Sequence, residues 1–483
     1  MNQTLKKQTL SASRWSIITQ LVTQGVTPIT YFILAFLLTP EDFGIIAIAT
    51  LVITFSRVFW EAGLSQALIQ DQDDDDSSAN FAFFTNIILS VFFYLLFFIF
   101  ADLIADIYNE ERLALVIQVF SFQIIISAFT AVQYALLRKE LRFKEIFAVR
   151  TLSLTIPKIL ITIPLAFIGF GYWSIIYGGI GSTIVELVAV WFFSDWKPKL
   201  KFKKEKIVNI TKFGLWVTVE FLFGWIFKSI DIALVGYFFD LSIGGLYNFA
   251  NTMISMLFTS SFGALVPVWF SAFSRIQNNI ESLRRNFILV TKFCVFLGLP
   301  MGFGLAIISD QLIQTFFTEE WHGMVQIFFF LGIVFGLRYA FASFASGFRA
   351  IGNAKVMPII IFINIIILVP SIIISANISL EAFLITYTLI QVVMTLVIHP
   401  YFAKKILSID AFELLRNLKY LLFACLLMIS TSIAFKFILD SIFSLPTIID
   451  LFLTIGFAGG IYFFTVFLLE RDFFKLLIKS IKN

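Results

Sequence analysis

The sequence predicts an all-α polytopic membrane protein, because apolar residues dominate it and recur in long uninterrupted runs. Hydrophobic residues make up 59% of its 483 residues, charged residues make up 14%, and the mean hydropathy is +0.93. These values lie far from the balance of soluble domains. The apolar runs are too long for the alternating strands of a membrane barrel, so we expect helices.

Fourteen segments are long enough to cross a bilayer as helices, which takes about 20 mostly apolar residues each. They occupy nearly the whole chain and leave no room for a soluble domain. The first segment has a cationic flank but lacks a cleavage site, so we expect a retained helix rather than a signal peptide. The expected spans are residues 14–38, 45–69, 81–105, 113–137, 146–168, 172–194, 211–239, 246–271, 287–309, 324–348, 357–376, 381–402, 420–439 and 447–469.

Two repeats of six helices are expected, followed by two additional helices. Trp15 and Gly44 match Trp216 and Gly245 at one offset, and the loop LRKELRFK resembles FRAIGNAK at a similar offset. Repeats of this kind are common in transporters. The predicted organisation is an N-terminal lobe in residues 1–195, a basic cytoplasmic linker in 196–210, a C-terminal lobe in 211–403, and helices 13 and 14 with a basic tail in 404–483.

The basic residues indicate the orientation of the chain. Lysines and arginines gather at both termini and in the loops after spans 4, 6, 8, 10 and 12, whereas the loops after odd-numbered spans hold only Arg112 and Lys436. The loop after span 2 is acidic and carries no cation, but acidic residues contribute little to orientation. Because basic loops remain in the cytoplasm, both termini are expected to be cytoplasmic. The basic linker 196–210 therefore reports membrane orientation, and a nucleic-acid partner is not expected.

Charged residues inside the expected spans are the candidate functional residues, because burying a charge in lipid is costly. Several spans also place polar residues on one helix face, which indicates either hydrogen bonding between helices or a polar pathway. Arg57 with Glu61, and Lys228 with Asp231, have spacings that would also suit local structural ion pairs. The charged set is Arg57, Glu61, Lys158, Glu186, Glu220, Lys228, Asp231 and Arg338.

Catalytic, cofactor and metal motifs are missing from the sequence. Cys294 and Cys425 fall inside spans, and His322 and His399 have no second ligand near them in sequence. The acidic stretch 71–78 lacks the spacing of a calcium loop. No glycine-rich phosphate loop or long outer loop is present. These features favour transport without a cofactor or metal over catalysis.

Four stretches resemble a known family, the polysaccharide transporters or Wzx-like oligosaccharide flippases of the multidrug/oligosaccharidyl-lipid/polysaccharide superfamily. The order and spacing of the stretches carry the likeness, which extends over nearly the whole chain. They are LTPEDFGIIAIATLVITFSRVFWEAGLSQALIQ from Leu38, ALLRKELRFKEI from Ala135, DIALVGYFFDLSIGGLYNFA from Asp231, and SFASGFRAIGNAKVMP from Ser343.

The resemblance implies export of an undecaprenyl-diphosphate-linked oligosaccharide across the bacterial inner membrane, by alternating access between two lobes. The glycan would be a repeat unit of O-antigen, capsule or exopolysaccharide, delivered to polymerase machinery. In this chain Arg57, Lys158, Lys228 and Arg338 would bind the anionic substrate. The four acids Glu61, Glu186, Glu220 and Asp231 balance those cations, and they are candidates for coupling to H⁺ or Na⁺.

Three alternatives remain open at the level of sequence. A multidrug or metabolite exporter of the same fold would bind organic cations through the acidic residues, although twelve helices are usual there. A lipid II flippase would also have fourteen helices. A membrane glycan polymerase or ligase would need a long catalytic outer loop, and the outer loops here are short.

Overall fold

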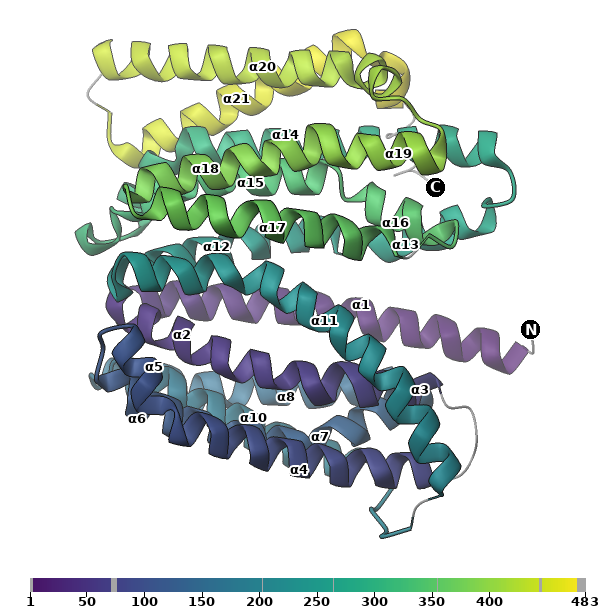
Figure 1. Ribbon diagram of the computed structural model, residues 1–483. Coiled ribbons are helices and arrows are strands. Elements are labelled where there is room, and N and C mark those ends of the chain that lie inside the picture. The colour runs from purple at the N-terminus through teal and green to yellow at the C-terminus, as the bar shows by residue number, and fades with distance from the viewer. Residues whose placement is uncertain are drawn as a thin grey trace. The chain divides into compact units, whose positions relative to one another are not determined.

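The computed structural model is built from helices throughout the part of the chain that it describes, with no strand there (Figure 1). It describes residues 3–70, 76–201, 203–263, 265–353, 355–442 and 445–475. The chain divides into two compact units, unit 1 (Met1–Asn248) and unit 2 (Phe249–Asn483).

Unit 1 contains the long amino-terminal helix and the helices up to the start of α12. Its core is apolar and centres on Ile45, Ile117 and Ile124, which are fully buried between α2, α6 and α7. The helices are α1 (Gln3–Ala35), α2 (Pro40–Arg57), α3 (Ser65–Gln70), α4 (Ser77–Ile99), α5 (Ala101–Ile107), α6 (Arg112–Phe120), α7 (Phe122–Lys139), α8 (Phe143–Pro157), α9 (Ile163–Phe167), α10 (Trp173–Phe193) and α11 (Lys204–Phe238), with α12 (Leu241–Phe262) beginning there and ending in unit 2.

In the described part of the chain, three short π-helical segments interrupt the regular helices: η1 (Val58–Leu64), η2 (Lys158–Thr162) and η4 (Met394–Ile398). Arg57 lies directly before η1, and Lys158 begins η2 directly after Pro157. Such π-bulges occur frequently at functional sites, and proline disrupts regular helical hydrogen bonding. Glu61 lies inside η1, so three of the charged residues singled out in the sequence lie where the helix geometry changes.

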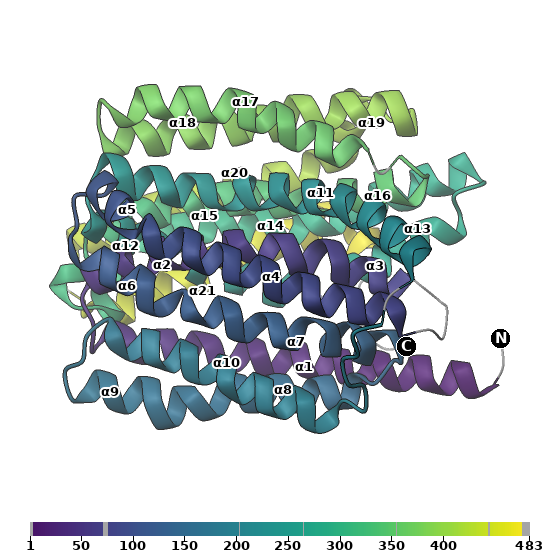
Figure 2. The same ribbon diagram turned by 60° about the horizontal axis from the view of Figure 1, so that its bottom comes forward.

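The helices of unit 2 form two pairs beside a central pair. Helices α14 and α15 form the central pair. Their backbones lie so close together that a Cβ atom on Gly302 would overlap the backbone of Gly332 and Gly336. Helices α20 and α21 pack against α14, and α17 runs beside α18 (Figures 1 and 2). The elements are α13 (Leu265–Arg275), α14 (Ile280–Phe316), η3 (Glu319–Trp321), α15 (Met324–Ala340), α16 (Ser343–Ala350), α17 (Val356–Ala376), α18 (Leu380–Val393), α19 (His399–Leu407), α20 (Ala411–Ile442) and α21 (Thr447–Leu469).

Eleven helices in the described ranges are long and apolar enough to cross a membrane, or up to twelve if α12 and α13 form one bent span. A polytopic helical membrane protein is therefore confirmed, whereas the number fourteen stays a prediction. The two other expected spans, 14–38 and 45–69, coincide with α1 and with α2 together with η1 and α3. The division into lobes at 195 and 211 also stays a prediction, and α11 packs against α2, η1 and α3 within unit 1.

Candidate functional site

A polar cavity of about 450 Å³ lies within unit 1, among α2, α3, α7, α8, α10 and α11. Among the side chains that the structure describes, three arginines, Arg57, Arg138 and Arg150, line it together with one acid, Glu186. Arginine stays protonated at all relevant pH values. The cavity therefore carries an excess of positive charge, and its volume falls in the range of about 300–1,000 Å³ that is typical of ligand sites.

A second cavity of about 350 Å³ shares Arg138 and Arg150 with the first. Its other walls come from polar residues of α1, including Thr19 and Gln20, and from Phe143 at the start of α8. The side chain of Arg150 is exposed and forms no ion pair or hydrogen bond with any residue that the structure describes. Two arginines thus serve both cavities, and the Arg150 guanidinium has its donors available.

Two of the residues predicted from the sequence line the first cavity. Arg57 donates from Nη2 to Ser127 Oγ at 3.2 Å, which orients its guanidinium between α2 and α7. Glu186 approaches from α10. The structure therefore brings together one predicted substrate-binding residue and one predicted coupling residue.

Lys158 has a different environment within unit 1. Its ammonium donates to Thr27 Oγ1 on α1 at 3.1 Å, and the residue is half-buried. Thr27 is a polar residue in the middle of α1, so α1 supplies the hydrogen-bond acceptor for the cationic residue of η2. This contact joins α1 to the segment in which the helix geometry changes.

The three charged residues of α11 differ in their environments. Asp231 is buried, with 4% of its surface exposed, and it accepts a hydrogen bond of 2.9 Å from the Tyr247 hydroxyl. Lys228 and Glu220 are exposed, and neither forms an ion pair or hydrogen bond with another described residue. The bond from α12 gives Asp231 a structural role that the sequence spacing did not reveal.

The remaining two candidates lie elsewhere. The side chain of Glu61 falls outside the described residues. Arg338 belongs to unit 2, where its Nη2 donates to the Tyr387 hydroxyl at 3.2 Å and its guanidinium lies 5.3 Å from the centre of the Phe335 ring. Aromatic side chains therefore hold this cation in place.

Sequence reasoning missed Arg138, Arg150 and Tyr134 as cavity residues, because the two arginines were counted as orientation signals near a cytoplasmic loop. The sequence nonetheless contains a pattern that could have identified them. Thr130, Tyr134 and Arg138 are spaced by four residues, so they share one face of α7.

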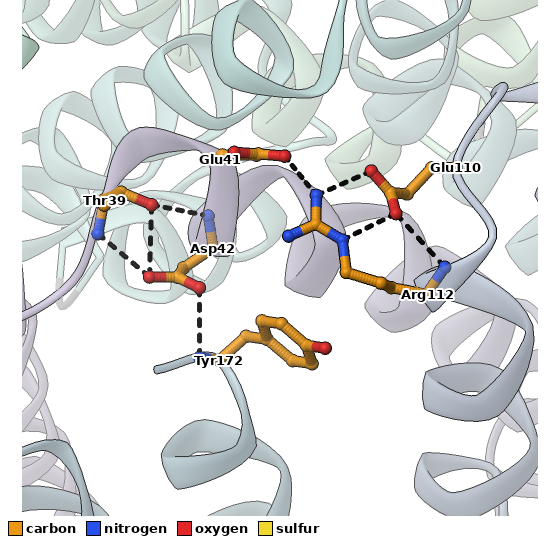
Figure 3. Close-up of polar contacts among 6 residues, drawn as sticks. All are labelled: Thr39, Glu41, Asp42, Glu110, Arg112 and Tyr172. Atoms are coloured by element: carbon orange, nitrogen blue, oxygen red, sulfur yellow. Dashed lines mark hydrogen bonds and ion pairs between the residues drawn. The ribbon is translucent and has the colours of Figure 1, made fainter. Parts of the chain in front are cut away.

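A polar network closes one end of unit 1 (Figure 3). Thr39 caps α2 in a reciprocal capping box with Asp42, and Asp42 Oδ1 also accepts from the backbone N–H of Tyr172 at 3.2 Å. Arg112 pairs with Glu41 and binds both carboxylate oxygens of Glu110 at 2.7 Å. Bidentate pairs of this kind fix geometry as well as charge.

Backbones meet directly at the same end. A Cβ atom on Gly44 would overlap the carbonyl oxygen of Leu241, and a Cβ atom on Gly245 would overlap that of Pro40. The first turns of α2 and α12 therefore touch without side chains between them. Gly44 and Gly245 are also the glycines that the sequence matched between the two expected repeats.

The Glu110–Arg112 pair should make the free energy of unfolding depend on pH in the acidic range. The Arg112 guanidinium holds the pKa of the Glu110 carboxyl below its ordinary value of 4.5, mainly by hydrogen bonding. A carboxyl group whose pKa is lower in the folded state than in the unfolded state stabilises the folded protein above pH 4.5. That stabilisation is lost as the pH falls through the lower pKa of the folded state. At pH 7 we expect Glu110→Gln to lose about 0.2–1 kcal/mol. Thermal unfolding in detergent at pH 7 and pH 3 measures this.

The difference between wild type and Glu110→Gln should shrink at pH 3. Glu111→Gln is the matched control, because Glu111 is exposed next to Glu110. An equal loss in both variants, or a difference that persists at pH 3, would contradict the role given to Arg112.

Comparisons with known proteins agree with this architecture. A family model described as polysaccharide biosynthesis protein matches residues 33–326. The succinoglycan biosynthesis transport protein ExoT of Rhizobium meliloti is 24% identical over 74% of this chain and 72% of its own. The lipopolysaccharide biosynthesis protein WzxC of Escherichia coli is 22% identical over 69% of this chain and 68% of its own.

Solved structures share the fold. The lipid II flippase MurJ in an inward closed conformation superposes with a TM-score of 0.74, at 16% identity, over 96% of this chain and 99% of that chain. An inward-facing multidrug resistance transporter of the MATE family gives a TM-score of 0.67, at 15% identity, over 80% and 94%.

Proposed function

Because the chain belongs to the polysaccharide biosynthesis protein family, we propose that it flips an undecaprenyl-diphosphate-linked oligosaccharide across the bacterial inner membrane. The glycan would be a repeat unit of O-antigen, capsule or exopolysaccharide, passed on to polymerase machinery on the outer side. Both termini would lie in the cytoplasm, as the distribution of basic residues favours.

The observation that carries the proposal is the arginine cavity of unit 1. A diphosphate or a sugar acid is anionic, and planar guanidinium groups bind such oxygens through paired hydrogen bonds. Arg57, Arg138 and Arg150 outnumber Glu186 at the cavity wall. Polar residues such as Thr130 and Gln66 in the same wall can bind the hydroxyl groups of a glycan.

The same charge balance weighs against an exporter of organic cations, whose site would need an excess of acid. A lipid II flippase remains the second candidate, because lipid II is also a diphosphate-linked glycan and the fold matches MurJ. Transport proceeds without a catalytic step in both cases. Coupling to H⁺ or Na⁺ through Glu61, Glu186, Glu220 or Asp231 is part of the proposal.

Deletion of the gene in its host tests the function. Loss of the flippase should lead to accumulation of lipid-linked repeat units on the cytoplasmic side and loss of surface glycan, as measured by mass spectrometry of extracted lipids. Rescue by the plasmid-borne gene is the control. Unchanged lipid-linked intermediates and surface glycan would exclude this function, and growth arrest with accumulated lipid II would favour the second candidate.

Arg338→Ala should lower export roughly tenfold to a hundredfold, because a charge-assisted contact to substrate is worth about 1.5–3 kcal/mol. Surface glycan of the complemented deletion strain gives the readout, with membrane abundance checked by immunoblot. Arg275→Ala serves as the control, since Arg275 is an exposed arginine of the same unit. Full export by Arg338→Ala would remove Arg338 from the proposed substrate-binding residues.

A further inference from the structure

A buried carboxylate lies within unit 2, at the start of α21 where this helix packs against α14. Asp450 has 8% of its surface exposed, and no described residue forms an ion pair with it. The nearby Lys436 pairs instead with Asp310, at 3.6 Å. An uncompensated charge inside a protein costs several kcal/mol, and either a counter-charge or a proton removes that cost.

Gln311 and Thr454 contact this carboxylate and retain free acceptor capacity. Gln311 of α14 is only 2% exposed, and its Nε2 donates to Asp450 Oδ2 at 3.1 Å, while its Oε1 has no hydrogen-bond partner. The Thr454 hydroxyl donates to Asp450 Oδ1 at 3.4 Å, which leaves its oxygen able to accept. Thr315, one turn beyond Gln311 on the same helix face, has a buried hydroxyl oxygen that is also unpartnered.

A purely structural role accounts for part of this arrangement. The amino-terminal end of α21 offers about half a positive charge to Asp450, and the Gln311 bond joins α21 to α14. Neither explains the Gln311 Oε1 atom, which can only accept and is buried without a donor. Amide oxygens and nitrogens are interchanged by a half-turn of the side chain. That half-turn would place Oε1 against the carboxyl group, which is favourable when a cation lies between them or when a carboxyl proton is shared with Oε1.

We propose that Asp450, Gln311, Thr315 and Thr454 form a sodium site between α14 and α21. A hard cation prefers carboxylate, carbonyl and hydroxyl oxygens. One carboxylate with neutral oxygens matches a single positive charge, whereas calcium sites generally use several carboxylates. The site is separate from the arginine cavity of unit 1, and binding of sodium does not depend on the proposed export.

Thermal unfolding of the purified protein in detergent tests the site, with sodium chloride compared with choline chloride at equal ionic strength. A ligand that binds only the folded state raises the melting temperature in a saturable way. We expect sodium to do this for the wild type and to have no effect on Asp450→Asn. Asp310→Asn, which changes the neighbouring exposed carboxylate, should respond to sodium like the wild type.

Thr454→Val provides a second variant in case Asp450→Asn does not fold. Loss of one oxygen that faces a charge should raise the half-saturating sodium concentration roughly tenfold. Equal melting temperatures of the wild type in sodium and choline would overturn the proposal. So would a sodium response that Asp450→Asn retains, or an unchanged half-saturation in Thr454→Val. Each of these results leaves the export assay of the deletion strain unaffected, so the two proposals fail separately.

Discussion

Replacement of Arg150 by glutamine is expected to lower glycan export roughly tenfold to a hundredfold, the equivalent of one lost charge-assisted hydrogen bond of about 1.5–3 kcal/mol. Arg150 lines both cavities of unit 1, and its guanidinium has no protein partner among the described residues. Its donors are therefore available to a ligand, and its replacement leaves no described acceptor unpaired. Folding should be preserved.

Surface glycan and lipid-linked intermediates in the complemented deletion strain measure this effect. Arg349→Gln is the matched control, because Arg349 is an exposed arginine near the end of α16 in unit 2 and lines neither cavity. Arg150→Lys should retain part of the activity, since it keeps the charge but loses the planar fork. Equal export by Arg150→Gln and the wild type would show that the anionic group of the substrate binds elsewhere.

The helical membrane fold could be predicted from the sequence because long apolar runs have few alternatives in a bilayer. The charged stripes also located part of the site, since Arg57 and Glu186 line the cavity. Arg138 and Arg150 could not be recognised in the same way. A basic residue that sets orientation and one that binds a ligand look alike in sequence, and only the packing of α7 beside α8 and α10 distinguishes them.

Partners that are distant along the chain account for other residues that the sequence could not assign. Asp231 was expected to pair locally or to face a pathway, yet the Tyr247 hydroxyl of α12 binds it. Asp450 was not among the charged candidates from the sequence, and its hydrogen bond with Gln311 comes from a different helix. Helix periodicity identifies which residues share one face of a helix. It does not identify which neighbouring helix packs against that face.

Replacement of Gly245 by alanine should disrupt the end of unit 1 at which α2 and α12 meet. The added methyl group would overlap the carbonyl oxygen of Pro40, which belongs to a helix backbone and cannot rotate away. Overpacking of this kind costs about 1–3 kcal/mol. We therefore expect a lower melting temperature and separation of the two helix ends. Gly456→Ala is the control, because a Cβ atom there meets nothing within 4 Å and alanine favours a helix by about 0.8–1.0 kcal/mol over glycine.

The separation can be measured by the reactivity of a cysteine placed at Leu241, which is buried at this contact. The native Cys294 and Cys425 are buried, so their background reaction with a polar thiol reagent should be low. Leu241→Cys should react faster in the Gly245→Ala background than alone, and Gly456→Ala should leave the rate unchanged. If flipping requires this contact to form and break, export should fall in Gly245→Ala as reactivity rises. Unchanged reactivity would mean that α2 and α12 accommodate the methyl group without separating. It would also mean that the contact between these two helix ends does not close the transport route.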